Sequence, residues 1–123
     1  GDADASATAL REAQEEVGLD PTLVQVVGVL PSYVTGSAFI ISPVIALVTP
    51  GFKLSLNAGE VADVFEVPLE FLMNPANHRR HSLEWQGVRR EWLSMPYLDG
   101  ETERFIWGAT AGMLRNFYRF LAA

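Results

Sequence analysis

Three glutamates near the start of the 123-residue chain, Glu12, Glu15 and Glu16, have a spacing suited to binding a metal ion. They belong to a stretch, residues 5–17, that is rich in alanine and contains no proline or glycine, so it is predicted to be helical. At about 100° per residue, Glu16 lies about 40° to one side of Glu12 and Glu15 about 60° to the other. The three carboxylates therefore share one helix face.

This arrangement is unfavourable for a helix that only needs to be stable. Like charges at these spacings weaken a helix by roughly a few tenths of a kcal/mol per pair. Glu15 and Glu16 also sit at the C-terminal end, where the helix dipole disfavours anions. A divalent cation would turn the repulsion into attraction, and hard carboxylate oxygens suit Mg²⁺ or Mn²⁺. The alternative is an acidic helix face that only contacts water.

The sequence of residues 11–19, Arg-Glu-Ala-Gln-Glu-Glu-Val-Gly-Leu, favours the metal site. It resembles the second half of the Nudix box, R-E-U-x-E-E-x-G-U, where U is an apolar residue, and all of the fixed letters match. The full box has a further glutamate eight residues before the arginine, where this chain has Ala3, and Asp2 is a candidate replacement. The glycine-rich loop of the box would precede Gly1, so we expect the chain to lack the N-terminal part of the domain.

The rest of the sequence predicts an α/β (α+β) domain with an adequate apolar core, since 49% of the residues are hydrophobic. Strands are expected over residues 23–30 and 38–48, the second of them buried and central, and a shorter strand over 54–57. Pro43 inside the second strand implies a bulge, an edge position or a strand start. Residues 69–73 should form a short helix, Gly87-Val88 a hairpin turn, and residues 105–121 a closing helix. The Nudix resemblance implies a single partial domain over residues 1–123, an α/β/α sandwich around a mixed sheet without its N-terminal strands.

Several later segments are similar to the coenzyme A pyrophosphatase branch of the Nudix family, namely residues 41–46, 56–61, 64–69 and 105–111. This similarity implies cleavage of the pyrophosphate of coenzyme A or its derivatives, giving 3′-phosphoadenosine 5′-phosphate and 4′-phosphopantetheine. The box itself is equally compatible with a nucleotide sugar or a dinucleotide as substrate. A Nudix-fold module that binds without catalysis is a third interpretation.

The resemblance also implies roles for individual residues. Glu15 and Glu16 would bind Mg²⁺ or Mn²⁺ directly, and Glu12 would either bind the metal as well or contact its ligands. Glu12 and Glu15 would thereby take part in catalysis. Glu60, which follows Gly59 in a predicted loop, is a candidate for a further ligand or general base; the alternative is an exposed loop carboxylate. Arg11 would fix a box glutamate by a salt bridge, and Gly18 would only terminate the helix.

A small basic cluster, His78-Arg79-Arg80-His81, is the candidate for contact with the substrate. Arg79 and Arg80 could bind the 3′-phosphate of coenzyme A, because arginine grips phosphate with two hydrogen bonds. The alternative is a solvated loop. A zinc site at the two histidines lacks further ligands, since the chain has no cysteine and no third histidine.

Charge and composition narrow the range of partners. The net charge is −6, and residues 1–20 account for −5 of it, with six acids and one base. This local acidity fits a metal site and argues against nucleic acid as a partner. No apolar run reaches transmembrane length, and the default expectation is a cytoplasmic protein that acts on a small nucleotide. The family resemblance leaves a homodimer open, and a sheet without its first strands would expose edges that promote self-association.

Overall fold

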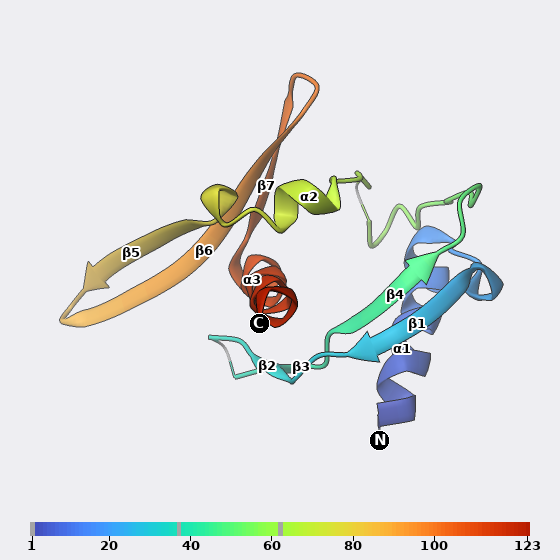
Figure 1. The fold of residues 1–123 in the computed structure, drawn as a ribbon, viewed down its shortest axis with the longest axis horizontal. Helices are drawn as coiled ribbons and strands as arrows, with labels where there is room; N and C mark the ends of the chain where they lie inside the picture. The colour runs from blue at the N-terminus through green and yellow to red at the C-terminus, as the bar shows by residue number, and fades with distance from the viewer. Residues whose placement is uncertain (1, 37, 62) are drawn as a thin grey trace. The chain divides into compact units, whose positions relative to one another are not determined.

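The structure is a computed structural model that describes residues 2–36, 38–61 and 63–123, with the side chains of residues 2–4 outside the description. The chain divides into two compact units, Gly1–Phe65 and Glu66–Ala123. Each unit combines helices with antiparallel strands (Figure 1). The α+β class predicted from the sequence is confirmed, and the single domain over residues 1–123 stays a prediction.

The first unit is a helix packed on a two-stranded ribbon. Helix α1 contacts β1 and β4, which pair antiparallel with Val24 opposite Val48 and a bulge between Val26 and Gly28. A second, very short pair joins β2 to β3. The elements of this unit are α1 (Asp2–Val17), the 3₁₀ turn η1 (Pro21–Leu23), β1 (Val24–Val29), β2 (Tyr33–Val34), β3 (Ile40–Ile41) and β4 (Val44–Val48).

The second unit is a three-stranded antiparallel meander in the order β5-β6-β7, with helix α3 packed against β6 and β7. Its fully buried residues are Ser94, Met95 and Ala111. Met95 and Ala111 belong to the core between α3 and the middle of β6. Gln86 and Gly87 both have positive φ, 50° and 76°, as a two-residue hairpin turn requires. The elements are α2 (Leu69–Leu72), the 3₁₀ turn η2 (Pro75–Asn77), β5 (Arg79–Trp85), β6 (Val88–Asp99), β7 (Thr102–Trp107) and α3 (Gly108–Ala122).

Most predicted elements are confirmed, including the first helix, the first strand, the short helix and the hairpin near Gly87. The strand predicted over residues 38–48 is wrong as a single buried element. Pro43 divides it into β3 and β4, because proline cannot donate to a ladder. Ile40 of β3 and Leu47 of β4 are largely exposed.

One boundary and one short strand also differ from the prediction. Residues 105–107 end β7 rather than begin the closing helix, and the helix starts at Gly108. Gly108 has φ +64°, and a Cβ there would meet nothing within 4 Å, so this glycine serves the strand-to-helix turn rather than close packing. Residues 54–57 form no strand. All strand pairs in the described ranges are antiparallel, so the parallel pairing of a mixed sheet is not seen there.

Candidate functional site

The box helix ends in a tight, glycine-dependent turn. Gly18 has φ +70° and its N–H donates to the Gln14 carbonyl at 3.0 Å, which is the bond of a left-handed C-cap. The last carbonyls of a helix have no partner within the helix, so they must be satisfied from outside. In this protein a segment from elsewhere in the first unit meets that need.

Residues 55–57 dock onto the exposed carbonyls at the end of α1. The Ser55 N–H donates to the Val17 carbonyl, and the Asn57 N–H donates to the Glu16 carbonyl, both at 2.8 Å. A Cβ on Gly18 would lie 3.0 Å from the Ser55 nitrogen and 3.1 Å from its oxygen. Gly18 therefore does more than the predicted termination of the helix, because it also allows the docked segment to approach this closely.

The docked segment continues directly into the turn that carries Glu60. The Asn57 carbonyl accepts the N–H of Glu60 at 2.9 Å and that of Val61 at 2.8 Å. The Asn57 side-chain oxygen also accepts the Gly59 N–H at 3.2 Å. Asn57 thus joins the backbone of Glu16 to the backbone of Glu60. The structure brings the Glu60 turn to the C-terminal end of the box helix, although 43 residues separate the two glutamates.

The carboxylates themselves are accessible. Glu12, Glu15 and Glu60 are exposed, and Glu16 is half-buried beside the docked segment. Within the described residues, no three acidic, histidine or cysteine side chains are gathered closely enough to hold a metal ion. The donor set nevertheless suits a hard divalent cation, since all four candidates supply carboxylate oxygens. The assignments of Glu12, Glu15, Glu16 and Glu60 stay predictions, as does the choice of Mg²⁺ or Mn²⁺.

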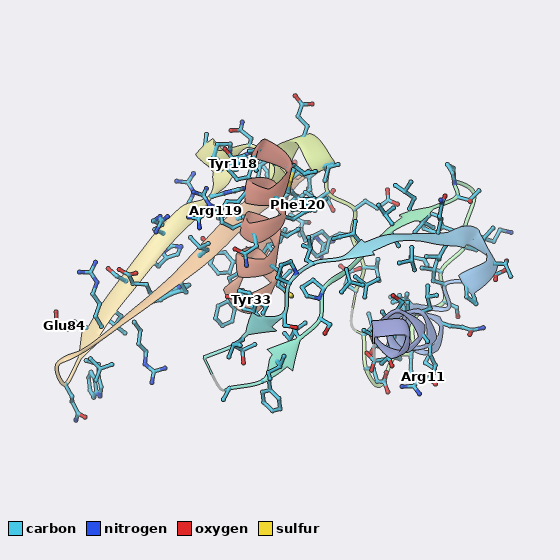
Figure 2. The ribbon with its side chains drawn as sticks, turned by 60° about the horizontal axis from the view of Figure 1, so that its bottom comes forward. Arg11, Tyr33, Glu84, Tyr118, Arg119 and Phe120 are labelled. Carbon is cyan, nitrogen blue, oxygen red and sulfur yellow. The ribbon has the colours of Figure 1, made fainter. Side chains whose placement is uncertain are left out.

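The structure gives less information about two other residues of the box, Arg11 and Asp2. Arg11 is exposed on α1 (Figure 2), and no ion pair joins it to a box glutamate in the part of the chain that the structure describes. The side chain of Asp2, the candidate replacement for the upstream glutamate, lies outside the described residues. Asn57 was missed by the sequence analysis, and the turn-forming sequence Asn57-Ala58-Gly59 was the available signal.

The basic cluster belongs to the second unit, where Arg79 and Arg80 open strand β5. Both are exposed, but they are successive residues of a strand, and successive side chains point to opposite faces. Arg79 pairs with Ser94 and Arg80 with Leu93 across the ladder. One phosphate group is therefore not gripped by both side chains from the same face of this strand, and their role in substrate binding stays a prediction.

The two histidines of the cluster have structural partners. The His78 ring donates from Nε2 to the Leu72 carbonyl at 2.6 Å and accepts at Nδ1 from Arg115 at 2.9 Å, because arginine can only donate. His81 Nε2 lies 2.6 Å from the Ser94 hydroxyl, and its ring stacks on Trp92 with centroids 5.3 Å apart. Each histidine of the cluster therefore has a hydrogen-bonding role within the second unit.

The protein combines an α+β fold with a glutamate-rich helix, α1, whose C-terminal end contacts the segment that leads into the Glu60 turn. The NUDIX domain family model matches residues 1–94, and the chain belongs to this family.

Individual relatives agree with the family assignment. The chain is 39% identical over 115 residues to "Nudix hydrolase 15, mitochondrial" of Arabidopsis thaliana, covering 92% of this chain and 40% of that protein. It is 37% identical over 116 residues to "Uncharacterized Nudix hydrolase NudL" of Citrobacter koseri, covering 94% and 58%. The NudL protein of Escherichia coli is 36% identical over a stretch of the same length. The chain therefore spans about half the length of the curated relatives it matches.

No helix among the described residues is long and apolar enough to cross a membrane.

Proposed function

We propose that this chain contributes the metal-binding part of a Nudix pyrophosphohydrolase that cleaves coenzyme A or its derivatives into 3′-phosphoadenosine 5′-phosphate and 4′-phosphopantetheine. The observation that carries the hydrolase proposal is the docking of the Glu60 turn onto the box helix through Ser55 and Asn57. Membership of the Nudix family supports the reaction type. The choice of coenzyme A as the substrate rests on sequence similarity to the coenzyme A pyrophosphatase branch of the family, in residues 41–46, 56–61, 64–69 and 105–111.

The candidate glutamates would act on a pyrophosphate, which water attacks only slowly. A pyrophosphate diester is negatively charged and repels a nucleophilic water; bound Mg²⁺ or Mn²⁺ would neutralise this charge and acidify the water. Glu15 and Glu16 would hold the metal through their carboxylates, with Glu12 as a further ligand from one turn earlier. Glu60 would accept the proton of the attacking water while a P–O bond of the anhydride breaks. The leaving phosphate carries away the electron pair of that bond.

Two alternatives remain open within this proposal. A nucleotide sugar or dinucleotide has the same reacting group, so the box glutamates would serve it equally. A binding module without catalysis is the second alternative. Against it stands the retention of Glu12, Glu15 and Glu16 on one helix face, where a protein that only binds has no use for their mutual repulsion. The cytoplasmic location and the small nucleotide partner stay predictions.

A product assay tests the proposal. The protein, expressed from its whole reading frame, is incubated with coenzyme A and Mg²⁺ or Mn²⁺, and the products are separated by chromatography. We expect 3′-phosphoadenosine 5′-phosphate from the native protein and a loss of about a hundredfold or more in rate for Glu15→Gln and Glu16→Gln, because even the residues that only support metal ligands contribute about 10–100-fold. Glu84→Gln is the matched control, since Glu84 is exposed near the tip of the β5–β6 hairpin (Figure 2).

Each result has a defined meaning. Cleavage of a nucleotide sugar or dinucleotide but not of coenzyme A would retain the hydrolase and reject the substrate. No cleavage of any pyrophosphate substrate with either metal would reject the hydrolase and favour the binding module. Equal losses in Glu15→Gln and Glu84→Gln would show that the box glutamates have no special role.

A further inference from the structure

Asn57 uses its backbone and its side chain together to connect the box helix to the Glu60 turn. Its N–H donates to the Glu16 carbonyl at 2.8 Å, which fixes Asn57 at the end of α1. Its carbonyl accepts the N–H of Glu60 at 2.9 Å and that of Val61 at 2.8 Å. Its side-chain oxygen Oδ1 accepts the Gly59 N–H at 3.2 Å. All of these residues belong to the first unit, so the connection lies within one compact part of the molecule.

The side chain of Asn57 is the part of this turn that depends on residue type. Every residue except proline has the backbone N–H and carbonyl that make the other bonds. A side-chain oxygen that accepts an N–H two residues later is supplied only by Asn, Asp, Ser and Thr. Gly59 is not needed for its conformational freedom, because its φ lies outside the left-handed region and an added Cβ would stay 3.6 Å from Asn57 Oδ1. The turn therefore depends on Asn57 more than on its glycine.

The place of Glu60 in the turn makes its carboxylate depend on Asn57. Glu60 is the fourth residue of the turn that begins at Asn57, and its own N–H closes that turn. The Glu60 side chain is exposed, so packing does not hold it. The backbone of the turn thus sets the point and the direction from which the Glu60 carboxylate extends.

We propose that Asn57 is a positioning residue for the hydrolysis step. Its side chain, through the Gly59 N–H, holds Glu60 at the end of the box helix, where the Glu60 carboxylate receives the proton of the attacking water. This inference rests on the proposed function, because Glu60 has that role only in a hydrolase. Asn57 acts through Glu60 and contacts no substrate, so its loss lowers turnover rather than substrate binding.

Steady-state kinetics with Mg²⁺ test this role in the protein expressed from its whole reading frame. The substrate is coenzyme A, or the nucleotide sugar or dinucleotide that replaces it in the product assay. Asn57→Ala should lower kcat about fivefold, the factor that corresponds to about 1 kcal/mol for one lost hydrogen bond, and leave KM within about twofold. Asn57→Ser should keep kcat within about twofold of the native value, because the serine hydroxyl can accept the same Gly59 N–H. In a Glu60→Gln background, Asn57→Ala should change kcat by less than about twofold, because the residue through which Asn57 acts is already lost.

Asn74→Ala is the matched control for the kinetics. Asn74 Oδ1 accepts the Ala76 N–H at 3.0 Å, so it makes the same kind of bond to the N–H two residues later. It belongs to the second unit and has no part in the proposed site. Asn74→Ala should therefore leave kcat and KM unchanged.

Amide hydrogen exchange of the metal-free protein gives a readout that does not depend on activity. Asn57→Ala should speed the exchange of the Gly59 and Glu60 N–H groups about fivefold, again the factor for one hydrogen bond. The Ser55 N–H should keep its protection, because its bond to the Val17 carbonyl does not involve the replaced side chain. This pattern distinguishes a loosened turn from a segment that has left α1.

The outcomes separate this inference from the proposed function. If the native protein cleaves no pyrophosphate substrate, or if Glu15→Gln is fully active, the hydrolase is rejected and the role of Asn57 with it. Cleavage that depends on Glu15 but is unaffected by Asn57→Ala would reject the positioning role alone. The same is true if Asn57→Ala lowers kcat as much in the Glu60→Gln background as in the native one, or if Asn74→Ala causes a similar decrease.

Discussion

Replacing Gly18 by alanine should disconnect the Glu60 turn from the box helix. Two costs arise, and the structure separates them. The first is conformational, since φ +70° is left-handed and costs an L-residue roughly 1 kcal/mol or more. The second is steric, because the new Cβ would lie 3.0 Å from the Ser55 nitrogen and 3.2 Å from the Ser55 Cβ, closer than such atoms normally approach. Relief of this clash requires residues 55–57 to move away from α1.

The magnitude follows from the bonds that would be lost. The movement breaks the hydrogen bonds from Ser55 to Val17 and from Asn57 to Glu16, each worth about 1 kcal/mol. Together with the conformational cost, Gly18→Ala should lower the free energy of unfolding by about 3 kcal/mol. Gly51→Ala is the matched control within the same unit, because φ at Gly51 is +92° and a Cβ there would meet nothing within 4 Å. Only the conformational cost, about 1 kcal/mol, applies to it.

Two measurements check this reasoning. Urea unfolding followed by far-ultraviolet circular dichroism gives the loss of stability for each variant. Amide hydrogen exchange gives the protection of the Ser55 and Asn57 N–H groups, which Gly18→Ala should lose and Gly51→Ala should keep. If the two variants lose equal stability and both amides stay protected in Gly18→Ala, the docked segment does not depend on Gly18 and the argument is refuted.

Two further predictions concern side chains outside the candidate metal site. A hydrogen bond from the Thr22 N–H, followed by one from its hydroxyl, holds the pKa of Asp20 below the ordinary value of 3.8. The ionised Asp20 carboxylate therefore stabilises the fold fully above pH 3.8, and this stabilisation is lost as the pH falls through the lowered pKa of Asp20 in the folded protein. The difference in the free energy of unfolding between the native protein and Asp20→Asn should shrink in that acid range. Arg115→Met should destabilise the second unit by about 1–3 kcal/mol, because it leaves His78 Nδ1 without its donor at 2.9 Å. Arg119→Gln, an exposed change one turn later (Figure 2), should cost less than about 0.5 kcal/mol; equal losses in urea unfolding followed by tryptophan fluorescence would contradict the role of Arg115.

Local sequence signals predicted the elements that are stabilised by local interactions. The alanine-rich run ending at Gly18 predicted α1, and Gly87 marked the hairpin turn that joins β5 to β6. These signals work because helix propensity and left-handed turns depend on neighbours within a few residues. The prediction was wrong for residues 38–48 and 105–107, where a dense apolar run is compatible with one strand, two strands or a helix. Cross-strand pairing decided between them.

The sequence by itself determined the family resemblance, the placement of Glu12, Glu15 and Glu16 on one helix face, and the need for glycine at position 18. All of these depend on spacing within one helix. Only the tertiary structure decided that the Glu60 turn docks at the end of that helix through Asn57, because its hydrogen-bond partners are distant along the chain. Only the strand register showed that Arg79 and Arg80 point to opposite faces. Backbone pairing between distant residues creates these relationships, and a linear pattern does not contain them.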